Sequence, residues 1–180
     1  LVPWVLATMR APGGWKHLFL QWAFGTLYFL VSLYWLWAVT PPGYVGLCVY
    51  LGLYWPVSAV LLRFLTGKNG RTGCFIWALP AVWGLQETLR STLMTGFPWA
   101  LLAYSQHENT SLVQITDIGG AMMVSGLILL VNGAICDVLL RPLAGPTLKK
   151  RNGLRRLLMP GPFWRAVWVG LLLAVVTMGY

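Results

Sequence analysis

Charge is what this sequence has least of. Only 9% of its 180 residues are charged, with four aspartates and glutamates in all, whereas 58% are hydrophobic. A soluble domain carries about 25% charged residues, so this composition excludes a soluble domain of useful size. It predicts an all-α, polytopic transmembrane helix bundle, because only helices and closed barrels satisfy their backbone polar groups within a membrane.

Cysteine is also scarce. Cys48, Cys74 and Cys136 lie within or at the ends of apolar runs and show no CxxC spacing. That placement is typical of small core residues, so we expect no disulfide and no metal site. The sequence contains no GxSxG, HExxH or glycine-rich phosphate loop, so no hydrolase, metalloprotease or nucleotide site is indicated, and we expect no cofactor.

Basic residues give the chain a net charge of +9, which by itself fits a nucleic-acid-binding protein. They gather, however, in short segments between apolar runs, at residues 10–16, 63–71 and 141–165. The intervening turn 40–43 is uncharged, and segment 95–117 contains no Lys or Arg. This alternation follows the positive-inside rule. It predicts cytoplasmic basic loops, including 141–165, an outward-facing interfacial loop at 95–117, and no nucleic-acid partner.

Long apolar runs separate these segments. A helix crosses a hydrocarbon core of ~30 Å with about 20 residues. We therefore expect one transmembrane helical domain over residues 1–180, a fragment of a longer protein, with about five full spans and the tail of a truncated one. The expected full spans are 18–39, 44–62, 74–93, 118–136 and 166–180, and the truncated span is 1–9.

Three features modify these spans. Pro56 lies inside span 44–62 and predicts a kink, because proline has no backbone N–H. Gly119 and Gly120 predict close approach of a neighbouring helix at the start of span 118–136. Asp137 is expected to pair with Arg141, one helical turn away.

The polar cluster near the end of span 74–93 is the main candidate site. Glu87 and Arg90 are three residues apart and share one helix face. One interpretation is an ion pair that locks the helix to the following loop. In the other, Arg90 meets a lipid phosphate or Glu87 orients a polar substrate, since charges at membrane depth are costly and often functional.

The loop that follows is aromatic. Gly96 and Pro98 predict a sharp turn. Phe97, Trp99 and Tyr104 then serve either as a plain interfacial anchor or as a lipid-facing lip that admits an acyl chain. Gln106 adds a hydrogen-bonding group, while the neighbouring His107 is expected to be solvated rather than catalytic.

One set of residues within 78–132 forms a recognisable pattern: Trp83, Glu87, Leu89, Arg90, Thr95-Gly96-Phe97-Pro98-Trp99, Tyr104-Ser105-Gln106, Gly119-Gly120, Val124-Ser125 and Val131-Asn132. This pattern resembles the membrane domain of the apolipoprotein N-acyltransferase family. The sequence departs from that family's usual pattern at Ala103 and at Ser91-Thr92.

The resemblance implies a multi-pass enzyme of the bacterial inner membrane. Such an enzyme moves an acyl chain from a phospholipid donor to the N-terminal cysteine of a diacylated apolipoprotein, in lipoprotein biosynthesis. It implies a thioester intermediate on a catalytic Cys, assisted by a Glu and a Lys. All three belong to a nitrilase-like domain expected in the periplasm after Tyr180, so this segment is expected to hold no catalytic residue and to be inactive alone.

The resemblance assigns a lipid-handling role to this segment, and two alternatives stay open. The chain could be a non-catalytic lipid-binding or assembly protein derived from the same spans. A small transporter is poorly supported, because no charged residue lies clearly mid-membrane. The expected substrate- or lipid-binding residues are Glu87, Arg90, Phe97, Trp99, Tyr104 and Gln106.

Overall fold

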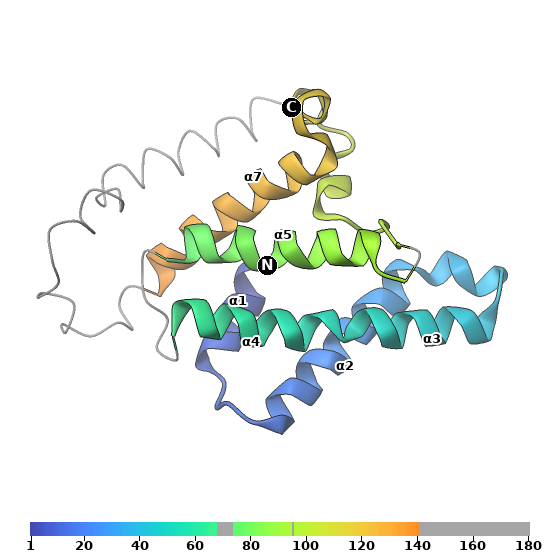
Figure 1. The fold of residues 1–180 in the computed structure, drawn as a ribbon, viewed down its shortest axis with the longest axis horizontal. Coiled ribbons are helices and arrows are strands. Elements are labelled where there is room, and N and C mark those ends of the chain that lie inside the picture. The colour runs from blue at the N-terminus through green and yellow to red at the C-terminus, as the bar shows by residue number, and fades with distance from the viewer. Residues whose placement is uncertain (68–73, 95, 141–180) are drawn as a thin grey trace, which may run out of the picture.

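The computed structural model describes residues 1–67, 74–94 and 96–140. Within these ranges every regular element is a helix, as the composition predicts (Figure 1). In chain order the elements are α1 (Val2–Arg10), α2 (Trp15–Ser32), η1 (Tyr34–Ala38), α3 (Pro41–Gly52), α4 (Tyr54–Thr66), α5 (Phe75–Thr92), η2 (Leu102–Gln106), α6 (Thr110–Val113) and α7 (Thr116–Leu139).

Two helical segments in the described residues are long and apolar enough to cross a membrane, Pro41–Thr66 and Thr116–Leu139. They correspond to the predicted spans 44–62 and 118–136. The expected bundle of about five full spans is not confirmed. The predicted span 166–180 and basic loop 141–165 lie outside the described residues.

Helix α5 matches predicted span 74–93 and α2 covers part of predicted span 18–39, but both are less apolar than α3 and α7. Gln21 lies within α2, and Gln86, Glu87 and Arg90 lie within the C-terminal half of α5. All four side chains are buried inside the protein. These four polar side chains therefore face other helices rather than the surroundings of the bundle.

The helix formed by α3 and α4 is interrupted at Leu53. Pro56 has no N–H to offer the carbonyl of Gly52, four residues earlier, and the interruption falls in that turn. Figure 1 shows α3 and α4 running end to end. The effect predicted for Pro56 is thus a local break in one long helix.

Three tryptophans form the centre of the core. The ring of Trp4 on α1 meets those of Trp55 on α4 and Trp83 on α5 edge to face, at centroid distances of 5.9 and 5.3 Å. Trp55 and Trp83 also meet edge to face, at 5.4 Å. Because aromatic pairs favour this geometry, the three rings fix α1, α4 and α5 to one another.

Helix α7 crosses beside α5 and caps its first turn. The carboxylate of Asp137 accepts hydrogen bonds from the backbone N–H groups of Phe75 and Ile76, at 3.3 and 3.1 Å. These are among the N–H groups that a helix leaves unsatisfied at its start. The predicted partner of Asp137, Arg141, lies outside the described residues.

The glycines of α7 differ from the prediction. The predicted close approach at Gly119 and Gly120 is wrong, because the helix breaks there and Gly120 adopts a left-handed φ of 66° in open space. Close approach occurs instead at Gly133. A Cβ built there would lie 2.7 Å from the Cα of Ile76 on α5.

Candidate functional site

The candidate site lies at one end of the bundle, where α5 ends and segment 96–109 begins. The opposite end is basic: Arg63 at the end of α4 donates hydrogen bonds to the carbonyl oxygens of Thr8 and Ala11, at the end of α1. The helices of the bundle therefore separate an end that carries Arg63 from an end that carries the loop.

The loop turns back on α5 through its own backbone. The N–H of Gly96 donates to the carbonyl of Leu93 at 2.9 Å, and the N–H of Phe97 donates to the carbonyl of Arg90 at 2.8 Å. Gly96 has a φ of 75°, and a Cβ at this position would press on the backbone of Ser91. The predicted turn is present, and its geometry requires glycine.

Three buried side chains hold the loop. The Oε1 atom of Glu87 accepts a hydrogen bond from the N–H of Leu102 at 2.9 Å, and Arg90 Nη2 donates to the carbonyl of Ala100 at 3.2 Å. Ser125 on α7 accepts through Oγ from the N–H of Ala103 at 3.1 Å. The exposed fractions of Glu87, Arg90 and Ser125 are 0%, 3% and 1%. We call these three residues the loop clamp.

The predicted direct ion pair between Glu87 and Arg90 is wrong, although the predicted link between helix and loop is present. The single ion pair within the described ranges joins His107 to Glu108. Glu87 and Arg90 instead each hold a backbone group of the loop. Their other polar atoms, Glu87 Oε2 and Arg90 Nε and Nη1, are buried and have no hydrogen-bond partner in the part of the chain that the structure describes.

Arg90 also lies over an aromatic ring. Its guanidinium carbon is 5.4 Å from the ring centroid of Phe29 on α2, within the range of a cation–π interaction. Phe29 is 2% exposed, so the cation is held against an apolar wall. Arg90 therefore joins α2, α5 and the loop.

The clamp holds the loop in a strained conformation. Ala100 has a φ of 54°, in the left-handed region that residues with a Cβ seldom adopt. Such a conformation costs of order 1 kcal/mol and persists only where the surroundings enforce it. The bonds from Arg90 and Glu87 fall on Ala100 and Leu102, on either side of one residue. The strain is thus maintained next to Trp99.

The aromatic residues of the loop form a half-exposed edge. The Trp99 ring lies 5.3 Å from that of Trp35 on η1 and 6.3 Å from that of Phe97. Tyr104 donates its hydroxyl hydrogen to the carbonyl of Pro98 at 3.1 Å. Trp99 and Tyr104 are 51% and 49% exposed. We call Trp35, Phe97, Trp99 and Tyr104 the aromatic edge.

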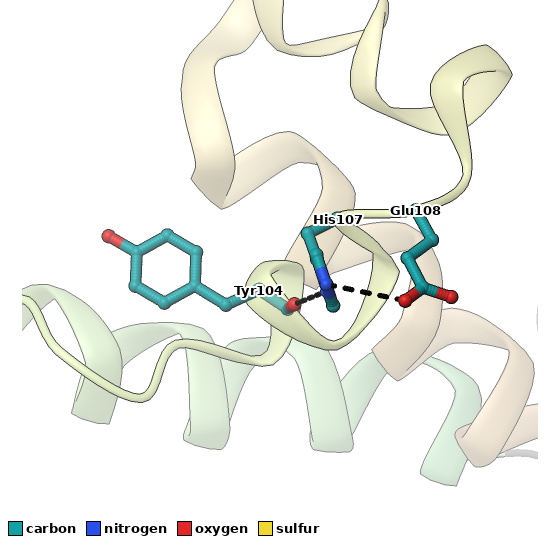
Figure 2. A network of polar contacts seen from close by, with 3 residues as sticks. All are labelled: Tyr104, His107 and Glu108. Carbon is teal, nitrogen blue, oxygen red and sulfur yellow. Dashed lines mark hydrogen bonds and ion pairs between the residues drawn. The ribbon is translucent and has the colours of Figure 1, made fainter.

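Gln106 and His107 lie away from the clamp. Gln106 Nε2 donates to Ser105 Oγ at 3.3 Å. Figure 2 shows the His107 ring between the Tyr104 carbonyl, 3.1 Å from Nδ1, and the Glu108 carboxylate, 3.7 Å from Nε2. The side chain of His107 is 74% exposed. The geometry brings Glu87 and Arg90 together with Phe97 and Trp99, but it does not bring Gln106 to them.

Sequence reasoning missed two contributors to the site. Ser125 was noted only as part of the family resemblance, and Trp35 was not assigned to the site. The one signal for Ser125 is a hydroxyl inside the apolar run of α7. Its role depends on a contact 22 residues away in sequence, with Ala103.

These features define the class of protein. It is a helical membrane protein whose described part holds an aromatic loop by buried polar side chains at one end of the bundle. Residues 1–134 match the family described as the apolipoprotein N-acyltransferase N-terminal domain. The chain therefore belongs to the apolipoprotein N-acyltransferase family.

Curated relatives agree with that assignment. The chain is 33% identical over 152 residues to the apolipoprotein N-acyltransferase of Rhizobium leguminosarum bv. trifolii, covering 77% of this chain and 26% of the relative. It is 36% identical over 132 residues to that of Geobacter metallireducens, covering 73% and 22%. The chain thus spans about a quarter of the length of these relatives. No solved structure was found to match it.

Proposed function

We propose that this chain is the membrane-embedded N-terminal part of an apolipoprotein N-acyltransferase. The reaction transfers an acyl chain from a phospholipid to the N-terminal cysteine of a diacylated apolipoprotein. The observation that carries the proposal is the family match over residues 1–134. The buried clamp supports it, because a costly polar arrangement in an apolar bundle is retained where function needs it.

In this proposal the chain positions lipid and does not form covalent bonds. Cys48 and Cys136 are fully buried within helices, where a thiol is inaccessible to a substrate. The thioester chemistry belongs to the Cys, Glu and Lys of the nitrilase-like domain that the family resemblance implies. The aromatic edge handles the acyl chains of donor and acceptor, because half-exposed indole and phenol rings favour the headgroup layer of a membrane.

The same proposal fixes an orientation in the bacterial inner membrane. The end of the bundle with Arg10, Lys16 and Arg63 faces the cytoplasm, in accordance with the positive-inside rule. The aromatic edge and segment 95–117 then face the periplasm. Their separation at opposite ends of the described helices supports this arrangement.

Replacing Trp99 by alanine tests the role of the aromatic edge. In the full-length enzyme we expect KM for the phospholipid donor to rise about tenfold, equal to about 1.4 kcal/mol of lost binding, with kcat little changed. The assay follows transfer of a radiolabelled acyl chain from phospholipid in mixed micelles to a diacylated lipopeptide. Trp77→Ala is the matched control, since Trp77 on α5 is 63% exposed and outside the site.

Two outcomes would contradict the proposal at different levels. An unchanged KM in Trp99→Ala, with normal expression, would show that the aromatic edge does not bind the phospholipid donor. Absence of acyl transfer by the purified wild-type full-length protein would reject the enzyme itself. That second result would favour the alternative of a non-catalytic lipid-binding or assembly protein.

Ser125 provides a test of the loop clamp. Ser125→Ala removes the acceptor for the buried N–H of Ala103, and an unsatisfied buried donor costs about 1–3 kcal/mol. We expect kcat of the full-length enzyme to fall severalfold, while Ser125→Thr, which keeps the hydroxyl, retains most of it. Ser111→Ala on exposed α6 is the control. Equal losses in the alanine and threonine variants would indicate a packing role without the hydrogen bond.

A further inference from the structure

A groove runs between α1 and α2, and its mouth lies at the end of the bundle opposite the loop clamp. It encloses a cavity of about 680 Å³, within the range of about 300–1,000 Å³ typical of ligand pockets. Its apolar lining includes Ala7, Ala23, Phe24 and Leu27. Phe24 and Leu27 are 57% and 58% exposed, so the groove opens toward the surroundings of the bundle.

A fixed polar network sets the spacing of the two helices at this groove. Gln21 on α2 accepts a hydrogen bond from the indole N–H of Trp4 at 2.6 Å and donates to the hydroxyl of Thr8 at 3.1 Å. Its amide also lies 3.5 Å from Nε2 of His17. The network satisfies the Gln21 amide internally and leaves the remaining wall of the groove apolar.

The groove continues into a second cavity at its basic end. The two cavities share Ala11, His17 and Leu20, and the second, of about 330 Å³, is also lined by Trp15 and Lys16. Its lining includes the backbone of the turn between α1 and α2. The groove is therefore apolar along its length and reaches Lys16 at its mouth.

Three basic residues of the described chain lie at the mouth. Arg10 ends α1 and Lys16 lies in the first turn of α2, and both side chains are exposed. Arg63 lies beside them, bonded to the carbonyl oxygens of Thr8 and Ala11. No acidic residue precedes Glu87 in the sequence. An anion at the mouth therefore meets three cations, and residues 1–67, which form this part of the structure, contain no carboxylate side chain.

The dimensions of the groove match one leaflet of a membrane. The stretch of α2 from Lys16 to Leu27 rises about 16 Å at about 1.5 Å per residue. Half of a hydrocarbon core of ~30 Å is about 15 Å. An acyl chain lying in the groove would thus begin at the cationic mouth and end near the middle of the membrane.

We propose that this groove binds one anionic phospholipid from the leaflet at the basic end of the bundle. An acyl chain occupies the cavity between α1 and α2, and the headgroup phosphate lies at Arg10 and Lys16. The exposed indole of Trp15, 72% exposed, lies at the headgroup level beside it. The site is at the opposite end of the helices from the aromatic edge, so this lipid is separate from the acyl donor.

Native mass spectrometry of the full-length protein tests the site. The protein is released from vesicles of equal parts phosphatidylglycerol and phosphatidylcholine, and the retained lipids are counted. We expect one phosphatidylglycerol retained in preference to phosphatidylcholine. Arg10→Gln with Lys16→Gln should lower that preference about tenfold or more, at about 1 kcal/mol per cation. Lys149→Gln with Lys150→Gln is the control, since it removes the same charge from a distant part of the sequence.

The acyl position is tested separately with phosphatidylglycerol that carries a photoactivatable group on its acyl chain. We expect crosslinks to peptides of α1 and α2, and Ala23→Trp, which fills the cavity, should remove them. No preference for phosphatidylglycerol in the wild-type protein, or an equal loss in the control variant, would overturn the proposal. So would crosslinking of Ala7→Cys to another segment of the protein, which would mean that protein fills the groove. None of these readouts depends on acyl transfer.

Discussion

Replacing Arg90 with alanine is expected to reduce N-acylation by the full-length enzyme about 100-fold, or about 2.7 kcal/mol at about 1.36 kcal/mol per tenfold. The change removes the hydrogen bond to the Ala100 carbonyl and the contact with the Phe29 ring. It also leaves the carboxylate of Glu87 buried with no nearby cation. Glu87 and Arg90 form no direct ion pair, but a buried charge that no nearby opposite charge compensates costs several kcal/mol.

The loss of the Arg90 side chain should first change the conformation of the loop. Ala100 occupies its left-handed conformation because Arg90 and Glu87 hold the backbone on either side of Leu101. Without Arg90 the backbone is free to relax toward an ordinary conformation. Trp99 immediately precedes Ala100, so the aromatic edge moves with it. Catalysis then falls because lipid is presented in the wrong place, since misplacement by about 1 Å can cost about 100-fold.

Two further variants separate loop positioning from folding. Arg90→Lys keeps the charge but loses the planar fork of donors, so activity between that of the wild type and that of Arg90→Ala is expected. In the double variant Arg90→Ala with Glu87→Gln the buried charge is gone. We expect expression and thermal stability to recover. Activity should stay low, because the Ala100 carbonyl still lacks the hydrogen bond from Arg90. Normal turnover in well-expressed Arg90→Ala protein would refute the clamp.

The sequence predicted helices correctly where a long apolar run alone determines that a helix forms. The predicted spans 44–62 and 118–136 are present as Pro41–Thr66 and Thr116–Leu139, each longer than predicted. The first begins early because Pro41 occupies a first-turn position, where its missing N–H costs nothing. A proline–proline–glycine turn in the sequence is therefore the start of a helix in the structure.

The predicted span 18–39 illustrates the opposite case. Helix α2 ends at Ser32, and the aromatic run that follows forms the 3₁₀ helix η1. Composition is apolar throughout, so hydropathy marks no boundary. One reason lies in tertiary structure: the hydroxyl of Tyr44 on α3 donates to the carbonyl of Leu30, near the end of α2. Such a contact is invisible in a single sequence.

The candidate site was likewise predicted only in part. Glu87 and Arg90 were found because charges are rare at membrane depth. Their true partners, the backbone groups of Ala100 and Leu102, carry no sequence signal, so a direct ion pair was the simplest expectation. Ser125 was missed for the same reason, since any helix can carry an isolated serine. The residue types in the sequence located the site, whereas the hydrogen-bond partners of those residues depend on the path of the loop.

Replacing Gly133 with alanine is expected to destabilise the protein by about 2 kcal/mol, although the same change in an open helix position stabilises by up to about 1 kcal/mol. A Cβ at Gly133 would lie 2.7 Å from the Cα of Ile76 and 2.8 Å from the carbonyl carbon of Phe75. Both obstacles are backbone atoms, so α5 and α7 must separate. That separation also stretches the bonds from Phe75 and Ile76 to Asp137.

Gly126 provides a matched control on the same helix, because a Cβ there meets nothing within 4 Å. Gly126→Ala should leave stability unchanged or raise it. Thermal unfolding of the full-length protein in detergent, followed with a thiol-reactive dye that labels Cys48 and Cys136 once they are exposed, measures both variants. Equal midpoints for the two variants would mean that α5 and α7 do not approach at Gly133. A lower midpoint confined to Gly133→Ala would confirm a close contact of α5 and α7 there, one turn before the carboxylate that caps α5.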